Sequence, residues 1–518
     1  MNSSTVSTPI YIFTAQLHST QRVLIDDINY SLQCINTINN VQLQLAGMLQ
    51  LCQLLYDIIL SNKQNTHEND EQYTDDTLYI HSLSITNSIH IICNTIIPYM
   101  NNPRIDMNIS RICYIVILYI AVHESVLIEQ IPNSTIDILI NILASGMTID
   151  TNNISNTTQT NGIPSKRAKS MNTVTAAQFI DIIHSDIGIT DNANIIQHST
   201  LYVLQYLSAS NIFKLLIVSP PNNTLLLQLL HRYTEHIMST NTIESNVLQL
   251  FSILERCTTN ELCAINIIQS NGTALLMKIT YHLLRYIQNH HQLQHNDGDT
   301  VQSLIGILLR LHINTSNHNK QYSILLLHQH DTGFDVLAEL VKLCLYHLTI
   351  TFNELSVLQP TTALNPTISS SYNITSSCLI ILINCMEYNN EFTSTIGDIN
   401  LCIDKLSIDV LDDTYNKCDI PFRQFVVLLF NKLYIMTHTH SIELTHEHEL
   451  ICRTLLSYIA TILSILLIDN SIGIICLITL NKLQFTLYSV CDVLNEFIDM
   501  QTQDQQFTNV CRTITIIH

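Results

Sequence analysis

The stretch Thr224–Met238, TLLLQLLHRYTEHIM, carries the hydrophobic spacing that decides the fold. Its apolar residues recur at intervals of three and four positions: Leu226, Leu229, Leu230, Tyr233 and Ile237. That spacing places them on one face of an α-helix, because 3.6 residues make one helical turn. The stretch is therefore predicted to be an amphipathic helix that packs its apolar face against other helices.

The same spacing recurs along the chain and predicts further helices. They cover Val23–Ile38, Val41–Ile59, Ile112–Ile128, Ile136–Leu143, Val247–Leu254, Leu275–Ile287, Val336–Leu348, Phe422–Met436, Leu450–Leu467 and Leu483–Phe497. Period-two alternation, which is typical of strands, is not sustained, and the Asn-Gly and Asp-Gly pairs lie between helical runs. The predicted fold class is all-α.

An array of helices fits the length of 518 residues better than one globular core does. Single hydrophobic cores stop growing near about 250 to 300 residues, whereas stacked repeats have no such limit. A HEAT or armadillo unit of two helices with their turns takes about 40 to 47 residues, which predicts on the order of ten helix pairs. We expect an α-solenoid of HEAT/armadillo-like helical repeats.

Five polar stretches interrupt this array. They are Ser61–Asp76, Thr148–Thr175, Asn289–Thr300, Leu358–Ser377 and Thr437–Glu449. Their composition cannot bury enough apolar surface to order itself, so loops or disordered insertions are expected there. The second stretch sets the predicted boundaries: an N-terminal helical lobe at 1–147, a disordered linker at 148–175 and a C-terminal helical-repeat domain at 176–518.

Glycine is scarce, and its spacing excludes several catalytic motifs. No two of the ten glycines are closer than Gly298 and Gly306. The dinucleotide fingerprint, the phosphate loop and the nucleophile elbow each need two glycines within five positions, so all three are absent. No pair of serine, histidine or carboxylate residues stands out as a catalytic dyad. We predict a non-enzymatic protein without a cofactor or a small-molecule substrate.

The charge balance argues against nucleic acid and membrane surfaces as partners. The chain has 22 Lys and Arg against 42 Asp and Glu, a formal charge of −20, and no basic stripe that could neutralise phosphates. The longest apolar stretches, Ile112–Val122 and Leu455–Ile468, fall short of the roughly 18 residues of a membrane span. Both are expected to be buried helices. Other proteins are therefore the predicted class of partner.

Cysteines and histidines are predicted to have structural rather than metal-binding roles. The 15 cysteines are scattered through apolar runs without any CxxC, which favours reduced core thiols and a reducing compartment. Histidines gather in two polar stretches: His438, His440, His446 and His448, and His290, His291 and His295. We favour solvated loops there, with a metal site as the alternative, because HExxH is absent and residues i and i+2 of a helix diverge.

One basic patch and the array itself bear on location and partners. Lys166, Arg167 and Lys169 form a three-residue basic cluster that is either a short nuclear-import signal or a chance patch in a linker. A solenoid presents a long concave face that binds peptides or other helices. From the residues alone, the chain is therefore a generic armadillo/HEAT-repeat scaffold or transport adaptor.

Three segments share motifs with one known protein family. Val247–Gly272 has a Leu-Glu pair, Leu254 and Glu255, before a Thr-containing turn and a second helix. Cys378–Phe392 has an apolar helix with a Leu-Ile-Asn and then Glu pattern, carried by Leu382, Asn384 and Glu387. Ser457–Gln501 has a leucine-rich helix, an Asp-Asn turn and a last helix with Glu496-Phe497. In these motifs and their order, the segments resemble the C-terminal helical-repeat domain of the wings apart-like (WAPL) cohesin-release family.

The resemblance implies a regulator that binds cohesin subunits and their HEAT-repeat accessory proteins and promotes release of cohesin from chromatin. It implies a nuclear, chromatin-associated location, and otherwise a cytoplasmic one. Two features depart from the family: Asn389 to Glu391 replace an expected basic residue, and the family's N-terminal Phe-Gly-Phe motifs are absent. For Glu255, Asn384 and Glu387 we favour helix capping or hydrogen bonds between repeats over partner contacts.

Overall fold

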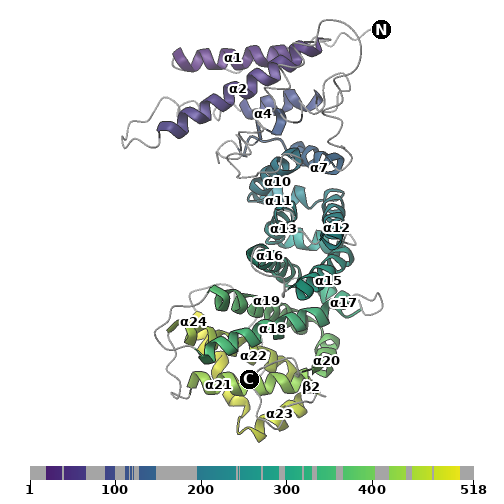
Figure 1. Cartoon of the computed structure of the whole chain (residues 1–518), viewed down its shortest axis with the longest axis vertical. Coiled ribbons are helices and arrows are strands. Elements are labelled where there is room, and N and C mark those ends of the chain that lie inside the picture. The colour runs from purple at the N-terminus through teal and green to yellow at the C-terminus, as the bar shows by residue number, and fades with distance from the viewer. Residues whose placement is uncertain are drawn as a thin grey trace. The chain divides into compact units, whose positions relative to one another are not determined.

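The computed structural model of the 518-residue chain describes most of the predicted helical regions (Figure 1). It covers residues 19–37, 40–65, 88–99, 111, 113–115, 117–118, 121, 128–146, 195–240, 243, 245–269, 272–290, 298–317, 320–328, 335–357, 366–402, 419–438, 446–469 and 472–501. Nearly all of these residues are helical, which confirms the all-α class. The strands among them are β1 (Asn400–Cys402) and β2 (Asp419–Pro421), an antiparallel pair in which Leu401 faces Ile420.

The chain divides into two compact units, at residues 1–217 and 218–518. The predicted linker at 148–175 lies outside the described residues. The division falls after that stretch because two helices from beyond it, α10 (Ile195–Leu207) and α11 (Asn211–Ile217), pack on α7 (Ser134–Gly146) in unit 1.

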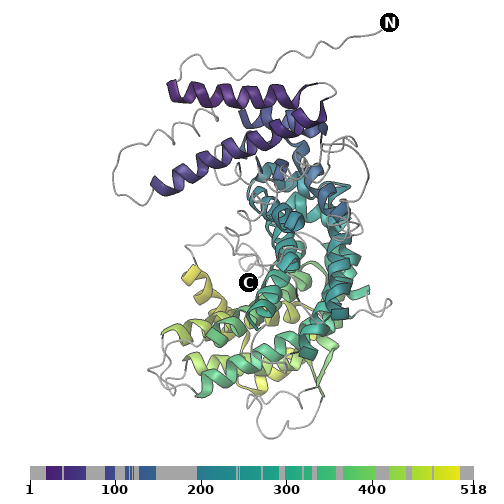
Figure 2. The same cartoon turned by 45° about the horizontal axis from the view of Figure 1, so that its top comes forward.

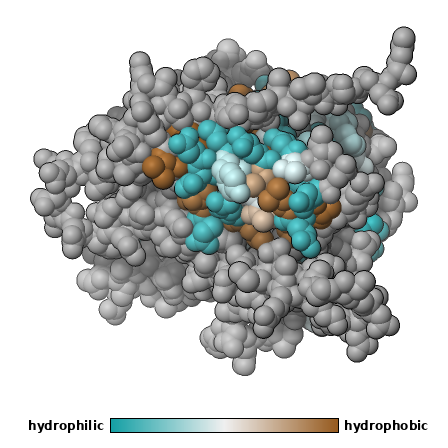
Figure 3. All heavy atoms as spheres, turned by 90° about the horizontal axis from the view of Figure 1, so that it is seen from above, coloured by the Kyte–Doolittle hydropathy of each residue, from teal (hydrophilic) through white to brown (hydrophobic). Residues whose placement is uncertain are grey.

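Unit 1 also contains a closely packed helix pair, α1 (Ser19–Ile35) and α2 (Val41–Asn65), with α4 (Ser88–Ile96) and the 3-10 turn η1 (Ile97–Tyr99) next to it. A side chain at Gly47 would lie 2.7 Å from the Ser31 carbonyl oxygen, so glycine permits this approach. Figure 3 views the α1 side and shows hydrophilic residues interleaved with hydrophobic ones.

Unit 2 holds the longer run of helices. These are α12 (Asn222–Thr240), α13 (Ser245–Thr258), α14 (Glu261–Gln269), α15 (Gly272–His290), α16 (Gly298–Ser316), α17 (Lys320–His328), α18 (Val336–Val357), α19 (Pro366–Tyr388), α20 (Asn390–Asp398), α21 (Phe422–His438), α22 (His446–Ile468), α23 (Ile472–Lys482) and α24 (Leu487–Gln501).

The long helices of unit 2 form two rows in which each helix contacts the helix three elements further on. One row runs from α12 to α15 and α18, and the other runs from α13 to α16, α19 and α22. Figures 1 and 2 show α12 and α15 beside α13 and α16 from two directions. The short helices α14, α17 and α20 lie between successive long pairs and contact both. The contacts therefore repeat every three helices, whereas the sequence predicted units of two.

Two tight turns shape the C-terminal end of unit 2. Asp469 Oδ1 accepts a hydrogen bond from the Ile472 amide at 3.1 Å and so caps α23. At the other end of α23, Gln484 adopts a left-handed conformation with φ 66°, and the Phe485 amide donates to the Leu480 carbonyl oxygen. Phe485 then packs edge-on against Phe430 of α21, with ring centroids 5.6 Å apart. The turns hold α23 and α24 against the preceding helices.

The prediction of a loop over Leu358–Ser377 is wrong in its second half. Helix α19 begins at Pro366, which suits the first helical position because its missing N–H needs no partner there. Its Ser- and Thr-rich first half looks polar, yet Thr375 donates to the Ser371 carbonyl oxygen and both residues are buried. Hydroxyl groups that bond within the helix can be buried at little cost.

The apolar stretch near residue 460 is also longer than predicted. Among the described helices, the Glu447–Ile468 part of α22 is long and apolar enough to cross a membrane, by length and composition. The bent pair α23 and α24 passes the same test only if it is taken as one span. However, 67% of the apolar stretch of α22 is buried inside the protein, as in a core helix.

Candidate protein-interaction surface

A row of polar side chains joins α13 to α16 in unit 2. Arg310 Nε donates to Glu255 Oε1 at 3.3 Å, and Asn314 Nδ2 donates to the Glu255 carbonyl oxygen at 3.2 Å. Asn314 Nδ2 also lies 3.2 Å from Thr258 Oγ1 at the end of α13. These bonds join residues 55 to 59 positions apart, so they tie one long helix to the next in its row.

The same row continues from α16 to α19 in the interior. Asn384 Nδ2 donates to Ser316 Oγ at 3.0 Å, and both side chains are buried. We call Glu255, Arg310, Asn314, Ser316 and Asn384 the polar row. The Arg310 side chain is 54% exposed, whereas Glu255 is 16% exposed, so Arg310 is the part of the row that a partner can reach. An ion pair with so exposed a member contributes at most about 1 kcal/mol.

Replacing Asn384 by alanine is expected to lower the free energy of unfolding by about 1 to 2 kcal/mol, because the buried Ser316 hydroxyl loses a donor. A double-mutant cycle of Asn384→Ala and Ser316→Ala, followed by urea unfolding, should give a coupling energy of about 1 kcal/mol. Thr395→Ala, at an exposed hydroxyl of α20, is the matched control and should change stability little. Strict additivity of the two substitutions would contradict the pairing.

The remaining residues singled out from sequence lie in other environments. Leu254 and Leu382 are buried core residues, and Glu387 is half-buried near the end of α19. The basic cluster of Lys166, Arg167 and Lys169 lies outside the described residues. Arg310, Asn314 and Ser316 were missed by sequence reasoning, although polar residues inside the apolar run of α16 are a signal that could have pointed to them.

Asn389, one of the departures from the family pattern, has a structural role. It is buried, and its Oδ1 accepts hydrogen bonds from the amides of Glu391 and Phe392 at the start of α20. An N-cap of this kind satisfies amides that the first turn of a helix leaves open. A basic residue could not accept these bonds.

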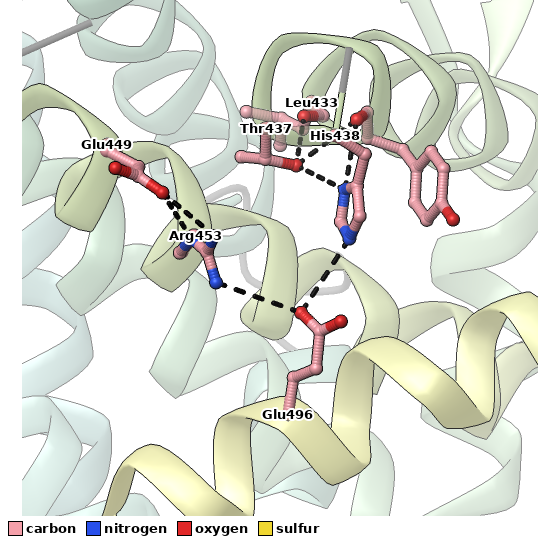
Figure 4. Close-up of polar contacts among 7 residues, drawn as sticks. Leu433, Thr437, His438, Glu449, Arg453 and Glu496 are labelled. Carbon is pink, nitrogen blue, oxygen red and sulfur yellow. Dashed lines mark hydrogen bonds and ion pairs between the residues drawn. The ribbon is translucent and has the colours of Figure 1, made fainter. Parts of the chain in front are cut away.

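A second polar group, the C-terminal polar cluster, joins α24 to α21 and α22 (Figure 4). Arg453 forms an ion pair with Glu449 at 2.8 Å and lies 3.9 Å from Glu496. His438 Nε2 lies 3.6 Å from the same Glu496 carboxylate, and its ring stacks on Tyr434 with centroids 4.0 Å apart. The prediction of a solvated loop at His438, His446 and His448 is wrong, because His438 ends α21 and the other two begin α22. No local pattern indicated that His438 and Glu496 meet.

The charged side chains of the C-terminal polar cluster are partly exposed to solvent. The side chains of Glu449, Arg453 and Glu496 are between 36% and 50% exposed, so water screens their charges. Thr437 Oγ1 lies 2.7 Å from His438 Nδ1 and also donates to the Leu433 carbonyl oxygen at 3.0 Å, which occupies its hydrogen atom. A hydroxyl held in this way is not activated as a nucleophile.

A buried polar chain links three helices in the centre of unit 2. His312 of α16 lies with Nε2 2.7 Å from Thr280 Oγ1 of α15 and with Nδ1 2.6 Å from the Tyr322 hydroxyl of α17. Thr280 donates its own proton to the Leu276 carbonyl oxygen, so it accepts from Nε2–H, and Tyr322 donates to Nδ1. One neutral tautomer thus satisfies every group. Burial lowers the pKa of His312 from 6.5 to about 4.

Apolar side chains are exposed at the C-terminal end of unit 2. Ile474, Ile475 and Ile478 lie on one face of α23, because their spacing is one and three positions, and Ile474 is 62% exposed. Together with exposed apolar residues at the end of α22 and the start of α24, they form the set that we call the terminal apolar surface: Ile468, Ile474, Ile475, Ile478, Leu487 and Tyr488. Helix α23 is apolar on all sides, a pattern in the sequence that typically marks a helix covered all round.

Histidine, cysteine and carboxylate side chains bear on metal binding and thiol chemistry. Within the described ranges, no group of three His, Cys, Asp or Glu side chains could hold a metal ion. The cysteines whose side chains the structure describes, such as Cys93 and Cys476, are buried free thiols. Burial raises the pKa of Cys93 to about 12 and that of Cys476 to about 11, so both stay protonated and unreactive at neutral pH.

Compared with known protein families and with curated proteins, the chain matches none of either.

Proposed function

We propose that this chain is a non-enzymatic helical-repeat protein that binds cohesin and its accessory subunits and promotes release of cohesin from chromatin. The observation that carries the proposal is the terminal segment Ser457–Gln501, whose sequence resembles the wings apart-like family. The segment contains the second half of α22, the Asp469 turn that caps α23, then α23 itself and α24. Glu496 of the acidic-aromatic stretch lies in the C-terminal polar cluster.

The other two segments support the same proposal through their local structure. Val247–Gly272 contains α13, a turn and α14, with Asn260 Oδ1 accepting from the Leu262 amide in the turn. Cys378–Phe392 contains the end of α19 and the Asn389 cap of α20. This order of helices and turns supports the proposal.

The architecture within the proposal is an α-solenoid of armadillo-like units in residues 218–518. A short helix followed by two long ones recurs three times, in α14–α16, α17–α19 and α20–α22. Armadillo-like repeats use two or three helices. Contacts that recur every third helix are what stacked three-helix units produce. The acidic surface suits basic patches on protein partners and disfavours DNA as a direct ligand.

The alternative, a scaffold or transport adaptor that binds extended peptides, has less support from the polar row. Peptide-binding solenoids of that kind use asparagine amides that stay available along the groove. Here Asn314 and Asn384 donate to Glu255, Thr258 and Ser316 of the protein itself. Their amides are occupied in holding helices together.

Affinity purification of the tagged chain from its own cells, followed by mass spectrometry, tests the proposal. Cohesin ring subunits and their HEAT-repeat regulators are expected above a tag-only control. Loss of the chain should lengthen the residence of fluorescent cohesin on chromatin, because release slows. The Gly306→Ala variant should restore normal residence, since alanine meets only the end of Arg310 at 3.5 Å.

A variant that disrupts the terminal segment provides the matched negative control. Gly473→Val places side-chain atoms against the α22 backbone, so this variant should fail to restore cohesin release. Recovery of transport cargo without cohesin, together with an unchanged cohesin residence time, would overturn the proposal in favour of the adaptor.

A further inference from the structure

The starting observation is an apolar groove in the terminal apolar surface, between the end of α22 and the start of α24. Leu467, Ile468, Leu487, Val490 and Cys491 line a half-open space of about 180 Å³. An apolar cavity of about 150 Å³ holds a benzene ring, so this space has the size for one aromatic side chain. Asp492, which follows Cys491 in α24, is exposed.

Residues 502–518, which lie outside the described structure, carry side chains that match this groove. The segment begins with the polar run TQDQQ and continues with Phe507, Val510, Ile514, Ile516 and Ile517. It contains one basic residue, Arg512, which is opposite in charge to Asp492. Burial of these five apolar side chains is favourable in free energy, and the exposed face of α23 offers an apolar surface for them.

The segment is long enough to reach the groove. Val490 and Gln501 are separated by about 16 Å along α24, at 1.5 Å per residue. The chain from Gln501 to Phe507 spans up to about 20 Å when extended. Phe507 can therefore return to the groove, and the residues after it can reach α23, which begins just after Ile468.

We propose that residues 507–518 fold back onto the terminal apolar surface, with Phe507 in the groove and the following apolar residues over the isoleucine face of α23. A tethered segment has an effective concentration in the millimolar range, far above that of a second copy in a cell, which favours it as the occupant. Solenoids need their end faces covered to remain soluble, and this segment performs that role. The inference does not depend on cohesin binding.

Hydrogen exchange of the full chain and of a variant ending at Gln501 tests the proposal. Peptides from α23 and the first turns of α24 are expected to exchange about tenfold faster in the shortened variant. Phe507→Asp in the full chain should have the same effect, whereas Gln505→Ala, in the polar run, should not. A synthetic peptide of residues 502–518, added at millimolar concentration, should restore slow exchange to the shortened variant.

Peptides from α12 to α16 act as an internal reference and should exchange equally in all variants. Equal exchange of α23 in the full and shortened chains would overturn the proposal. The proposal would also be overturned if protection of α23 rises with protein concentration and light scattering gives a dimeric mass. That result assigns the surface to a second copy. Protection that requires added phosphatidylcholine vesicles would overturn it as well and assign the surface to lipid.

Discussion

Alanine at position 473 is expected to weaken the junction of α22 and α23 by about 3 kcal/mol, because overpacking against an element that cannot move costs this much. A Cβ atom at Gly473 would lie 2.4 Å from the carbonyl oxygen of Leu467 and 3.0 Å from its carbonyl carbon. Both are backbone atoms, so the two helices must separate. Amide hydrogens of α23 and α24 should exchange about a hundredfold faster in Gly473→Ala, as measured by mass spectrometry.

The same substitution at Gly306 is the matched control and has the opposite expected sign. Gly306 lies within α16, and the nearest atom to an added Cβ is Arg310 Nη1 at 3.5 Å. Alanine is favoured over glycine inside a helix by about 1 kcal/mol, so Gly306→Ala should stabilise unit 2. Equal effects at both positions would contradict the close approach of Gly473 to α22.

Acidification is expected to destabilise unit 2 by about 2.5 kcal/mol between pH 7.5 and 4.5 through His312 alone. Burial lowers the pKa of His312 from 6.5 to about 4, so above pH 6.5 neither the folded nor the unfolded chain binds the proton. As the pH falls below 6.5, the unfolded chain takes up a proton that the folded chain refuses until about pH 4. The stability is therefore lost across that window.

Comparison of His312→Leu with the parent chain isolates this contribution from the other histidines. In urea unfolding, His312→Leu should be less stable at pH 7.5, because the Tyr322 hydroxyl loses its acceptor. Its stability should fall less on acidification than that of the parent. His236→Gln, at an exposed position of α12, should keep the parental pH dependence. Parallel pH profiles for the parent and His312→Leu would rule out the buried neutral histidine.

The helices of unit 2 were predictable where one apolar face dominates. The periodicity of Thr224–Met238 indicated a helix, and α12 covers that stretch with Leu226, Leu229 and Leu230 buried. The first half of α19 was not predictable in this way, because Ser371 and Thr375 look solvated in sequence and are buried in the fold. Burial by neighbouring helices decides such segments, and local composition does not encode it.

The polar groups of the candidate surface were predictable one at a time and not as pairs. Glu255 and Asn384 stood out because the resemblance covers them. Their partners, Arg310 and Ser316, lie 55 and 68 positions away. No local pattern records which residue of the next long helix will face a given side chain, since that depends on how the rows stack. The three-helix period of contacts was not predictable from the sequence for the same reason.

The main contacts of the long helices in unit 2 are with near neighbours, and this determines how the unit unfolds. The described contacts of α12 are with α13 and α15, and those of α24 are with α22, so no strong contact ties the two ends together. In heat or denaturant, unit 2 should then unfold progressively from its less stable end, and the transition should be broad. The free energy of unfolding should also depend less steeply on denaturant concentration than the length of the unit implies. When the two ends are pulled apart mechanically, unit 2 should extend in steps, each of which unfolds one group of three helices.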